Sequence, residues 1–261
     1  MIRLIASDLD GTLLQNKSQS LTKRALILIQ KLQEQGIVFV AASGRQYPNL
    51  YRLFEPVSKE MAFLCENGAL VMYHEKVIAK HILDRSLALA LMEDIYEHEG
   101  CEVLLSGQNT SYLKPKDPAY TYRMEKIVRN NIQIVQSFEE VTEPFLKVSV
   151  YEKSGIMDHT GPYFINKWKD QLKCTFSGDG WLDFVCPDVN KGTALTELLT
   201  KLKITPEQVI AFGDNYNDLE MLSMVGYGYC MENAPKEIKE QYSYHTSSVE
   251  DTLEKFLCQF L

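Results

Sequence analysis

The sequence predicts an α/β protein in which a doubly wound parallel sheet is interrupted by an inserted α+β segment. Three observations carry this prediction. Short apolar runs of strand length occur near both ends of the chain, as buried strands of a parallel sheet require. Amphipathic helical stretches separate these runs, which is the order of βαβ units. The middle of the chain instead alternates helices with pairs of short strands, a pattern typical of an antiparallel sheet.

The N-terminal stretch predicts one βαβ unit. We expect buried strands over residues 2–7 and 37–42, because both runs are apolar. Between them, apolar residues recur at helical spacing and a glycine follows where helices commonly end: Leu21, Ala25, Leu28, Ile29, Leu32 and Gly36. The two strands should therefore lie side by side and parallel.

The C-terminal third repeats this order. A helix is predicted from the apolar spacing of Ala194, Leu195, Leu198, Leu199 and Leu202. A buried strand should follow over residues 208–212, then a short helix near residues 219–222 and a strand over residues 227–231. Both ends of the chain are therefore expected to build one sheet.

The middle of the chain predicts a separate α+β domain. Each of two helices there precedes a hairpin, and a further strand lies between the two sets; the expected ranges are helix 87–98 with strands 101–105 and 110–114, strand 145–151, and helix 164–172 with strands 174–177 and 182–185. We expect a discontinuous core over residues 1–82 and 186–261, with residues 83–185 inserted as a cap domain.

Composition excludes several classes of protein. The 261 residues carry 27 Lys+Arg against 35 Asp+Glu, a formal net charge of −8, which argues against nucleic-acid and anionic-membrane partners. No apolar run approaches the roughly 20 residues that span a bilayer. A single cation, Arg3, precedes a short apolar run that ends at Asp8, unlike a signal peptide. Six dispersed cysteines lack metal-ligand spacing, so we expect buried free thiols and a cytoplasmic protein. We expect a monomer or a homodimer.

The sharpest motif is Asp8-Leu9-Asp10-Gly11-Thr12, directly after the first predicted strand. Ligands of open α/β sheets bind at the carboxyl ends of strands, so both carboxylates stand where chemistry is expected. Two acids two positions apart on a strand point to opposite faces, but a turn at Gly11 can bring them to one pocket. A solvated Asp-Gly turn is the alternative.

Two shorter motifs could bind anions. Ser43-Gly44-Arg45 ends the second predicted strand, where a hydroxyl and bare backbone N–H groups can hold phosphate oxygens. Asn190-Lys191-Gly192 opens a predicted helix with a lysine. Alone, the first motif is weak because Ser-Gly turns are common, and an ordinary surface lysine is the favoured interpretation of the second.

A fourth motif, Gly213-Asp214-Asn215-Tyr216-Asn217-Asp218, follows another buried strand. Its two aspartates and two asparagines supply the hard oxygen ligands that suit Mg²⁺. Loops rich in Asn and Asp are often only turns. Four such motifs, all at strand ends or helix starts, together indicate one site.

The set of motifs resembles the haloacid dehalogenase superfamily of phosphohydrolases, and its order and spacing resemble the Cof-type branch. Glu66-Asn67-Gly68-Ala69 and Glu232-Asn233-Ala234 also match that branch, whereas Thr252 stands where the family often has Gly. The resemblance implies a Rossmann-like core, a cap that is inserted between the second and third motifs, and hydrolysis of a phosphate ester.

The resemblance also implies roles for individual residues. Asp8 would be the nucleophile that forms an aspartyl-phosphate, and Asp10 the general acid and base. Mg²⁺ would be held by Asp8, Asp214 and the Asp10 backbone carbonyl. Residues that hold the phosphoryl group would be Leu9, Ser43, Gly44, Lys191 and Asn217, surrounded by Thr12, Arg45, Asn215 and Asp218, the last orienting Lys191 or the metal's surroundings.

The identity of the substrate stays open at this point. We expect a small phosphorylated metabolite, a sugar phosphate first and a cofactor phosphate such as pyridoxal phosphate or FMN second. Trp181 and Asp183, on a predicted strand of the insertion, either contact the substrate or simply pack. A phosphoryl transferase or mutase on the same scaffold, or a non-catalytic regulator that binds a phosphometabolite, are the alternative functions.

Overall fold

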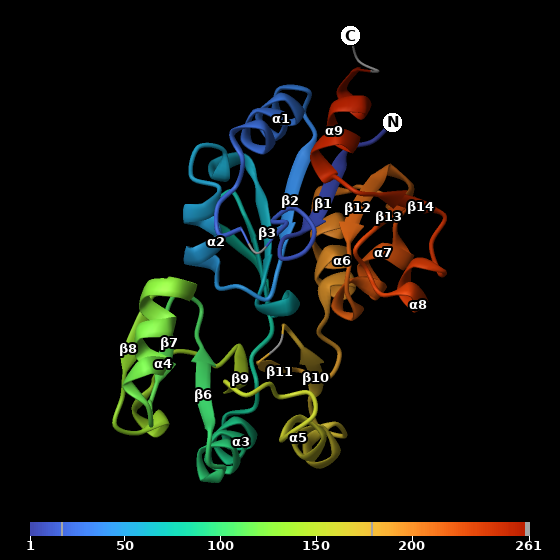
Figure 1. Cartoon of the computed structure of the whole chain (residues 1–261). Coiled ribbons are helices and arrows are strands. Elements are labelled where there is room, and N and C mark those ends of the chain that lie inside the picture. The colour runs from blue at the N-terminus through green and yellow to red at the C-terminus, as the bar shows by residue number, and fades with distance from the viewer. Residues whose placement is uncertain (17, 179, 259–261) are drawn as a thin grey trace. The chain divides into compact units, whose positions relative to one another are not determined.

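The computed structural model describes residues 1–16, 18–178 and 180–258, and the chain divides into two compact units (Figure 1). The core unit comprises residues 1–43, 50–79 and 190–261, and the inserted unit comprises residues 44–49 and 80–189. Each unit is described separately below.

The core unit contains an eight-stranded sheet in the order β14-β13-β12-β1-β2-β3-β4-β5. Pairing is parallel from β14 to β3, and β4 is antiparallel to β3. The strands are β1 (Leu4–Asp8), β2 (Val38–Ala42), β3 (Ala62–Cys65), β4 (Leu70–Tyr73), β5 (Lys76–Lys80), β12 (Val209–Gly213), β13 (Tyr227–Met231) and β14 (Tyr244–Thr246). The parallel part confirms the predicted α/β fold class.

Strand β1 is the centre of this sheet. It pairs in parallel with β2 on one side, with Leu4 opposite Val38, and with β12 on the other, with Leu4 opposite Val209. The chain thus leaves β1 toward one side of the sheet and later returns to the other side. Such a point of reversal is where α/β sheets bind their ligands.

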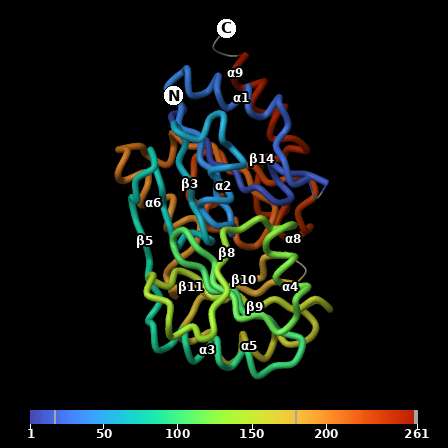
Figure 2. The backbone as a smooth tube through the Cα atoms, turned by 90° about the vertical axis from the view of Figure 1, so that its left-hand side faces the viewer, coloured from blue at the N-terminus to red at the C-terminus, as the bar shows by residue number. Residues whose placement is uncertain are grey.

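Helices cover the core sheet and are α1 (Lys23–Glu34), α2 (Tyr47–Leu53, at the boundary of the two units), α6 (Lys191–Leu202), α7 (Leu219–Met224), α8 (Lys236–Lys239) and α9 (Val249–Leu257). Helix α6 buries Ala194, Leu195 and Leu198 against apolar side chains of β1, β2 and β12. Helix α9 packs beside α1 (Figure 2), where Arg24 forms exposed ion pairs with Asp251 and Glu254. The apolar periodicities therefore predicted the faces of α1 and α6.

The inserted unit contains a six-stranded sheet in the order β10-β11-β9-β6-β7-β8. Its strands pair antiparallel except β7 and β8, which are parallel. The elements are α3 (Arg85–Glu97), β6 (Cys101–Ser106), β7 (Ser111–Leu113), α4 (Pro118–Tyr122), β8 (Ile132–Ile134), β9 (Lys147–Glu152), α5 (Gly161–Trp168), β10 (Lys173–Phe176) and β11 (Trp181–Val185). This is the expected α+β character.

Helices α3 and α5 pack on the inserted sheet around one apolar cluster that includes Leu91, Phe164 and Val150. Asp94 on α3 joins the two helices, because its carboxylate accepts hydrogen bonds from α5: Lys167 Nζ at 2.7 Å, Trp168 Nε1 at 2.8 Å and Tyr163 Oη at 3.0 Å. Burial disfavours the charged form of Asp94, but these donors outweigh it and hold its pKa below the ordinary value.

The predicted elements differ from the structure mainly at their ends. Helix α5 runs from Gly161 to Trp168, whereas the expected range was 164–172. The helix begins three residues earlier than expected because Pro162 occupies its first turn, where proline is favourable. Strands β3, β4, β5, β8 and β14 were not among the predicted elements. All six cysteines lie within the described residues and are free thiols. Three are buried as predicted (Cys65, Cys101 and Cys230), whereas Cys174 and Cys186 are partly exposed and Cys258 is exposed, so the expectation of burial was wrong for these three. Among the described residues, none of the helices combines the length and apolarity needed to span a bilayer.

Candidate active site

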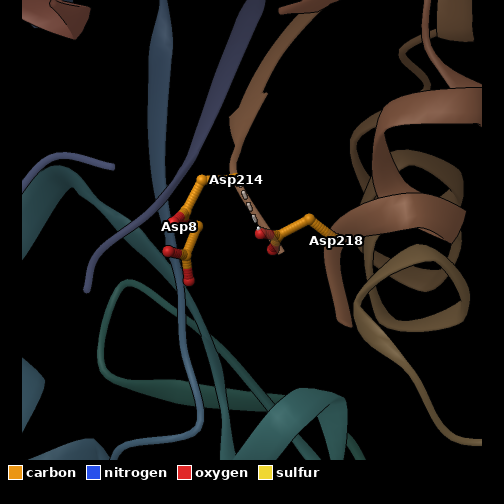
Figure 3. A group of neighbouring side chains, drawn as sticks. All are labelled: Asp8, Asp214 and Asp218. Atoms are coloured by element: carbon orange, nitrogen blue, oxygen red, sulfur yellow. Dashed lines mark hydrogen bonds between the residues drawn. The ribbon is translucent and has the colours of Figure 1, made fainter. Parts of the chain in front are cut away.

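The predicted carboxylates lie at the carboxyl ends of two adjacent strands. Asp8 is the last residue of β1, and Asp214 directly follows β12, which pairs with β1 in parallel (Figure 3). Asp8 is buried, with 6% of its surface exposed, and Asp214 is partly buried. Parallel pairing therefore brings together two acids that are about two hundred residues apart in sequence.

The chain turns sharply after β1. Gly11 has φ +94°, and its N–H donates to Leu14 O at 3.0 Å, while Thr12 N donates to Leu9 O at 3.1 Å. A Cβ at Gly11 would lie 2.3 Å from Asp214 Oδ2, so only glycine fits both the backbone conformation and the space. Asp10 lies in this turn and is exposed, unlike Asp8.

Lys191 is the first residue of α6 and is completely buried. Its ammonium donates to Asp8 Oδ1 at 2.5 Å and to Asp218 Oδ1 at 2.6 Å. Burial lowers the pKa of Lys191, but the charges of Asp218 and Asp8 more than offset it, so the net pKa is raised. Asn190 caps the helix by accepting from Thr193 N, which fixes the position of Lys191 on the first turn.

Asp218 holds the loop after β12 as well as Lys191. Its Oδ2 accepts from Asp214 N at 3.0 Å and from Asn215 N at 3.1 Å, and its side chain is inaccessible to solvent. Asn215 in turn accepts from Tyr216 N at 2.8 Å, capping a short 3₁₀ turn. Asp218 therefore contacts both Lys191 and the backbone of this loop, and its role in orienting Lys191 stays a prediction.

The carboxylates form a site of concentrated negative charge. Oxygen atoms of Asp8, Asp214 and Asp218 lie within 4.8 Å of one another. Burial raises the pKa of Asp8 well above its ordinary value; Lys191 lowers it, whereas Asp218 and Asp214 raise it further. Burial likewise raises the pKa of Asp214. Three carboxylates against one ammonium leave two negative charges, and these oxygen donors fit Mg²⁺ in charge and in ligand type.

The predicted phosphate-binding residues of the core unit are joined through Asn67. Ser43 follows β2 and is buried, and its carbonyl accepts from Asn67 N at 3.1 Å. Asn217 Nδ2 donates to Asn67 Oδ1 at 3.4 Å. Asn67 itself has a left-handed backbone, with φ +58°. Gly44 belongs to the inserted unit, where its carbonyl accepts from Lys147 Nζ at 2.7 Å, and Arg45 beside it is partly exposed.

The two substrate candidates of the inserted unit lie on β11. Trp181 packs against the ring of Tyr151, with centroids 4.7 Å apart. Asp183 is buried and accepts from Ser149 Oγ at 2.5 Å, Ser177 Oγ at 2.8 Å and Lys147 Nζ at 3.2 Å. These contacts explain how both side chains are held, and their role toward substrate stays a prediction.

Two residues at the site had no role in the sequence-based prediction. Asn67 follows β3, and Asn233 follows β13 and donates to Asp214 Oδ2 at 3.1 Å. Both stood in segments that match the Cof-type branch, and both follow buried strands of the sheet. Strand β13 before Asn233 was predicted but β3 before Asn67 was not, so the match to the branch was the indication available for both residues.

Comparison with known proteins identifies relatives along the whole chain. The family model of haloacid dehalogenase-like hydrolases matches residues 5–254. The Escherichia coli 5-amino-6-(5-phospho-D-ribitylamino)uracil phosphatase YbjI is 28% identical and covers 98% of this chain and 96% of its own. The E. coli pyridoxal phosphate phosphatase YbhA is 25% identical over 91% of this chain and 90% of its own.

Solved structures show the same fold. SMU.1108c from Streptococcus mutans superposes with a TM-score of 0.86 at 29% identity, covering 99% of this chain and all of its own. A subclass IIB sugar phosphatase of the haloacid dehalogenase superfamily, BT4131, superposes with a TM-score of 0.81 at 18% identity, covering 97% of this chain and 98% of its own.

Proposed function

We propose a mechanism for this chain, which belongs to the haloacid dehalogenase-like hydrolase family and is a phosphoric monoester hydrolase. It dephosphorylates a small metabolite through a phosphorylated Asp8, with Mg²⁺ as cofactor. One observation carries the proposal. The Asp8 carboxylate is buried at the end of β1, is paired with the ammonium of Lys191 and faces a second carboxylate, Asp214.

The reaction follows from the chemistry of two acids. An Asp8 oxygen attacks phosphorus, the bond from phosphorus to the ester oxygen breaks, and Asp10 gives its proton to that leaving oxygen. Asp10 then takes a proton from water, whose oxygen attacks phosphorus, releases inorganic phosphate and restores the Asp8 carboxylate. Asp10 suits proton exchange because it is exposed, whereas Asp8 is buried.

Other side chains hold the phosphoryl group and the metal. Lys191 supplies positive charge beside Asp8, and Ser43 and Asn217 supply a hydroxyl and an amide donor; Leu9 and the Gly44 N–H complete the proposed phosphate contacts. The carboxylates of Asp8 and Asp214 with the Asp10 carbonyl would hold Mg²⁺. When bound, Mg²⁺ supplies the charge that offsets repulsion between a carboxylate and a phosphate dianion.

The proposed substrate is a sugar phosphate or a cofactor phosphate. The relatives support both classes, because one is named for a phosphorylated ribityl compound and another for pyridoxal phosphate. We place catalysis in residues 1–82 and 186–261 and substrate choice in residues 83–185. We further propose that the protein works in the cytoplasm as a monomer or homodimer, without nucleic-acid or membrane partners, in keeping with its net charge of −8.

A panel of phosphomonoesters with Mg²⁺ tests this function. We expect hydrolysis of one class well above p-nitrophenyl phosphate, loss of activity in EDTA and its return with Mg²⁺. Asp8→Asn should abolish turnover, whereas Asp10→Asn should slow it about 10²–10⁴-fold, the usual contribution of general acid–base catalysis. Near wild-type turnover by Asp8→Asn, or full activity without metal, would contradict the mechanism. Transfer of phosphate to an acceptor alcohol in preference to water would instead indicate a transferase or mutase.

The role of the inserted unit has its own test. Trp181→Ala and Asp183→Ala should each change kcat/KM for the preferred substrate more than for p-nitrophenyl phosphate. Equal losses for both substrates would mean that these residues support folding rather than specificity.

A further inference from the structure

Asn233 connects the turn after β1 to the predicted metal carboxylate. It lies two residues after β13, and its Nδ2 donates to Gly11 O at 3.0 Å and to Asp214 Oδ2 at 3.1 Å. One amide group therefore ties together two segments that are separated by about two hundred residues. This single amide group fixes both the backbone of the turn at Gly11 and the side chain of Asp214.

We propose that Asn233 is a positioning residue that sets the orientation of the Asp214 carboxylate for divalent metal binding; this inference rests on the proposed Mg²⁺-dependent phosphatase function. Thr12 Oγ1 donates to Asp214 Oδ1 at 2.8 Å, and Asn233 donates to Oδ2, so each oxygen has one donor. Each carboxylate oxygen keeps a second lone pair. The two donors thus fix the carboxylate plane and leave both oxygens able to coordinate a cation.

The surroundings of Asn233 separate this role from a purely structural one. Asn233 is exposed and lines a pocket of about 420 Å³ together with Gly11, Gln15, Asn16, Glu232 and Ser247. If its side chain is removed, water from this pocket can reach Asp214 Oδ2. The carboxylate would then keep a hydrogen-bond partner and lose only its fixed orientation, so the fold should persist while the metal site loosens.

Binding of Mn²⁺ in the absence of any phosphate ester tests the proposal, because Mn²⁺ takes the same oxygen ligands as Mg²⁺ and is followed by its paramagnetic resonance. Asn233→Leu keeps the number and branching of the side-chain heavy atoms without a donor, and Asn233→Ala removes the side chain beyond Cβ. We expect the dissociation constant for Mn²⁺ to rise about 10–100-fold in both variants, the usual effect of losing a partner of a metal ligand.

Gln15→Ala is the matched control. Gln15 lines the same pocket with the same type of side chain, but its amide donates to Ser247 O at 2.7 Å. Its loss should leave the Mn²⁺ affinity unchanged. At saturating Mg²⁺, the kcat of the Asn233 variants should recover to near the wild-type value, which Asp8→Asn should not do.

The outcomes distinguish the two levels of proposal. If wild-type protein binds Mn²⁺ and hydrolyses a phosphate ester, but folded Asn233→Leu and Asn233→Ala bind Mn²⁺ within about twofold of wild type, the role of Asn233 is refuted and the phosphatase function stands. If the wild-type protein neither binds Mn²⁺ nor hydrolyses any ester, the proposed function fails and this inference fails with it. An equal loss of affinity in Gln15→Ala would also refute the inference.

Discussion

Removal of the Asp218 carboxylate should strongly destabilise the core unit. This carboxylate makes three hydrogen bonds, one to the Lys191 ammonium at 2.6 Å and two to backbone N–H groups of Asp214 and Asn215 at 3.0 and 3.1 Å. Both side chains of the ion pair are inaccessible to solvent. Asp218→Ala would leave Lys191 with Asp8 as its remaining ion-pair partner and would leave two amide donors unpaired.

The expected cost follows from these contacts. Breaking a buried ion pair costs about 3–5 kcal/mol when the remaining charge loses its partner, but Lys191 keeps Asp8, so the cost here is smaller. The Asp214 and Asn215 N–H groups are only partly buried, so water can replace the lost acceptor, and each adds less than the roughly 1–3 kcal/mol of a fully buried unpaired donor. We therefore expect Asp218→Ala to lower the free energy of unfolding by about 1.5–3 kcal/mol, the range for losing a hydrogen bond to a charged group. Asp218→Asn keeps the volume of the side chain and one acceptor oxygen, so it should lower the free energy of unfolding by less than Asp218→Ala does.

Urea unfolding in EDTA measures this difference without a contribution from bound metal. Asp251→Ala is a control of similar geometry, because Asp251 lies 2.7 Å from Arg24 but both side chains are about half exposed. Its removal should leave the unfolding free energy essentially unchanged, since solvent screens the pair. A loss below about 1 kcal/mol for Asp218→Ala, the range of surface pairs, would refute the reasoning.

Three further predictions concern single positions. Gly11→Ala should reduce kcat/KM about 100-fold, because its Cβ would displace the Asp214 carboxylate; steady-state kinetics with Mg²⁺ would show it, and unchanged kinetics would contradict it. Since the pKa of Asp94 is lowered in the folded state, its ionisation stabilises the protein above about pH 4 and this contribution disappears as the pH falls below that value. The midpoint temperatures of thermal unfolding of the wild type and of Asp94→Asn should thus differ at pH 7 and converge at pH 2. Burial raises the pKa of Cys174 to about 11, so iodoacetamide at pH 8 should alkylate exposed Cys258 well before Cys174, as peptide mass spectrometry can verify.

Much of the sheet could be predicted because its central strands are short apolar runs flanked by amphipathic helices. The range 227–231 agrees with β13, and the pairing of residues 2–7 with 37–42 agrees with β1 and β2. Strand β5 was missed because it lies at the edge of the sheet and is largely exposed, so it lacks an apolar run. Strand β14 has only three residues, too few for a periodicity to emerge.

The predicted site residues could be placed near one another because parallel strands end at the same edge of a sheet. That rule brings Asp8 to Asp214 without any further information. The contacts between loops are different: the hydrogen bond from Asn233 to Gly11 and the buried surroundings of Asp183 depend on long-range packing. Residue type and local spacing do not indicate which distant residues such side chains will contact.

The central position of β1 has a consequence for how the protein is made. Its neighbour β2 follows about 30 residues after β1, but β12 is synthesised about 200 residues later. During translation one edge of β1 therefore lacks its native partner strand, while residues 80–189 can complete their own sheet beforehand. Bringing β1 and β12 together closes a loop of about 200 residues, which is slow, and until then the free edge of β1 can pair with a wrong strand. Because Asp8 ends β1 and Asp214 directly follows β12, the chain can assemble its candidate catalytic centre only after β12 has been synthesised and paired with β1.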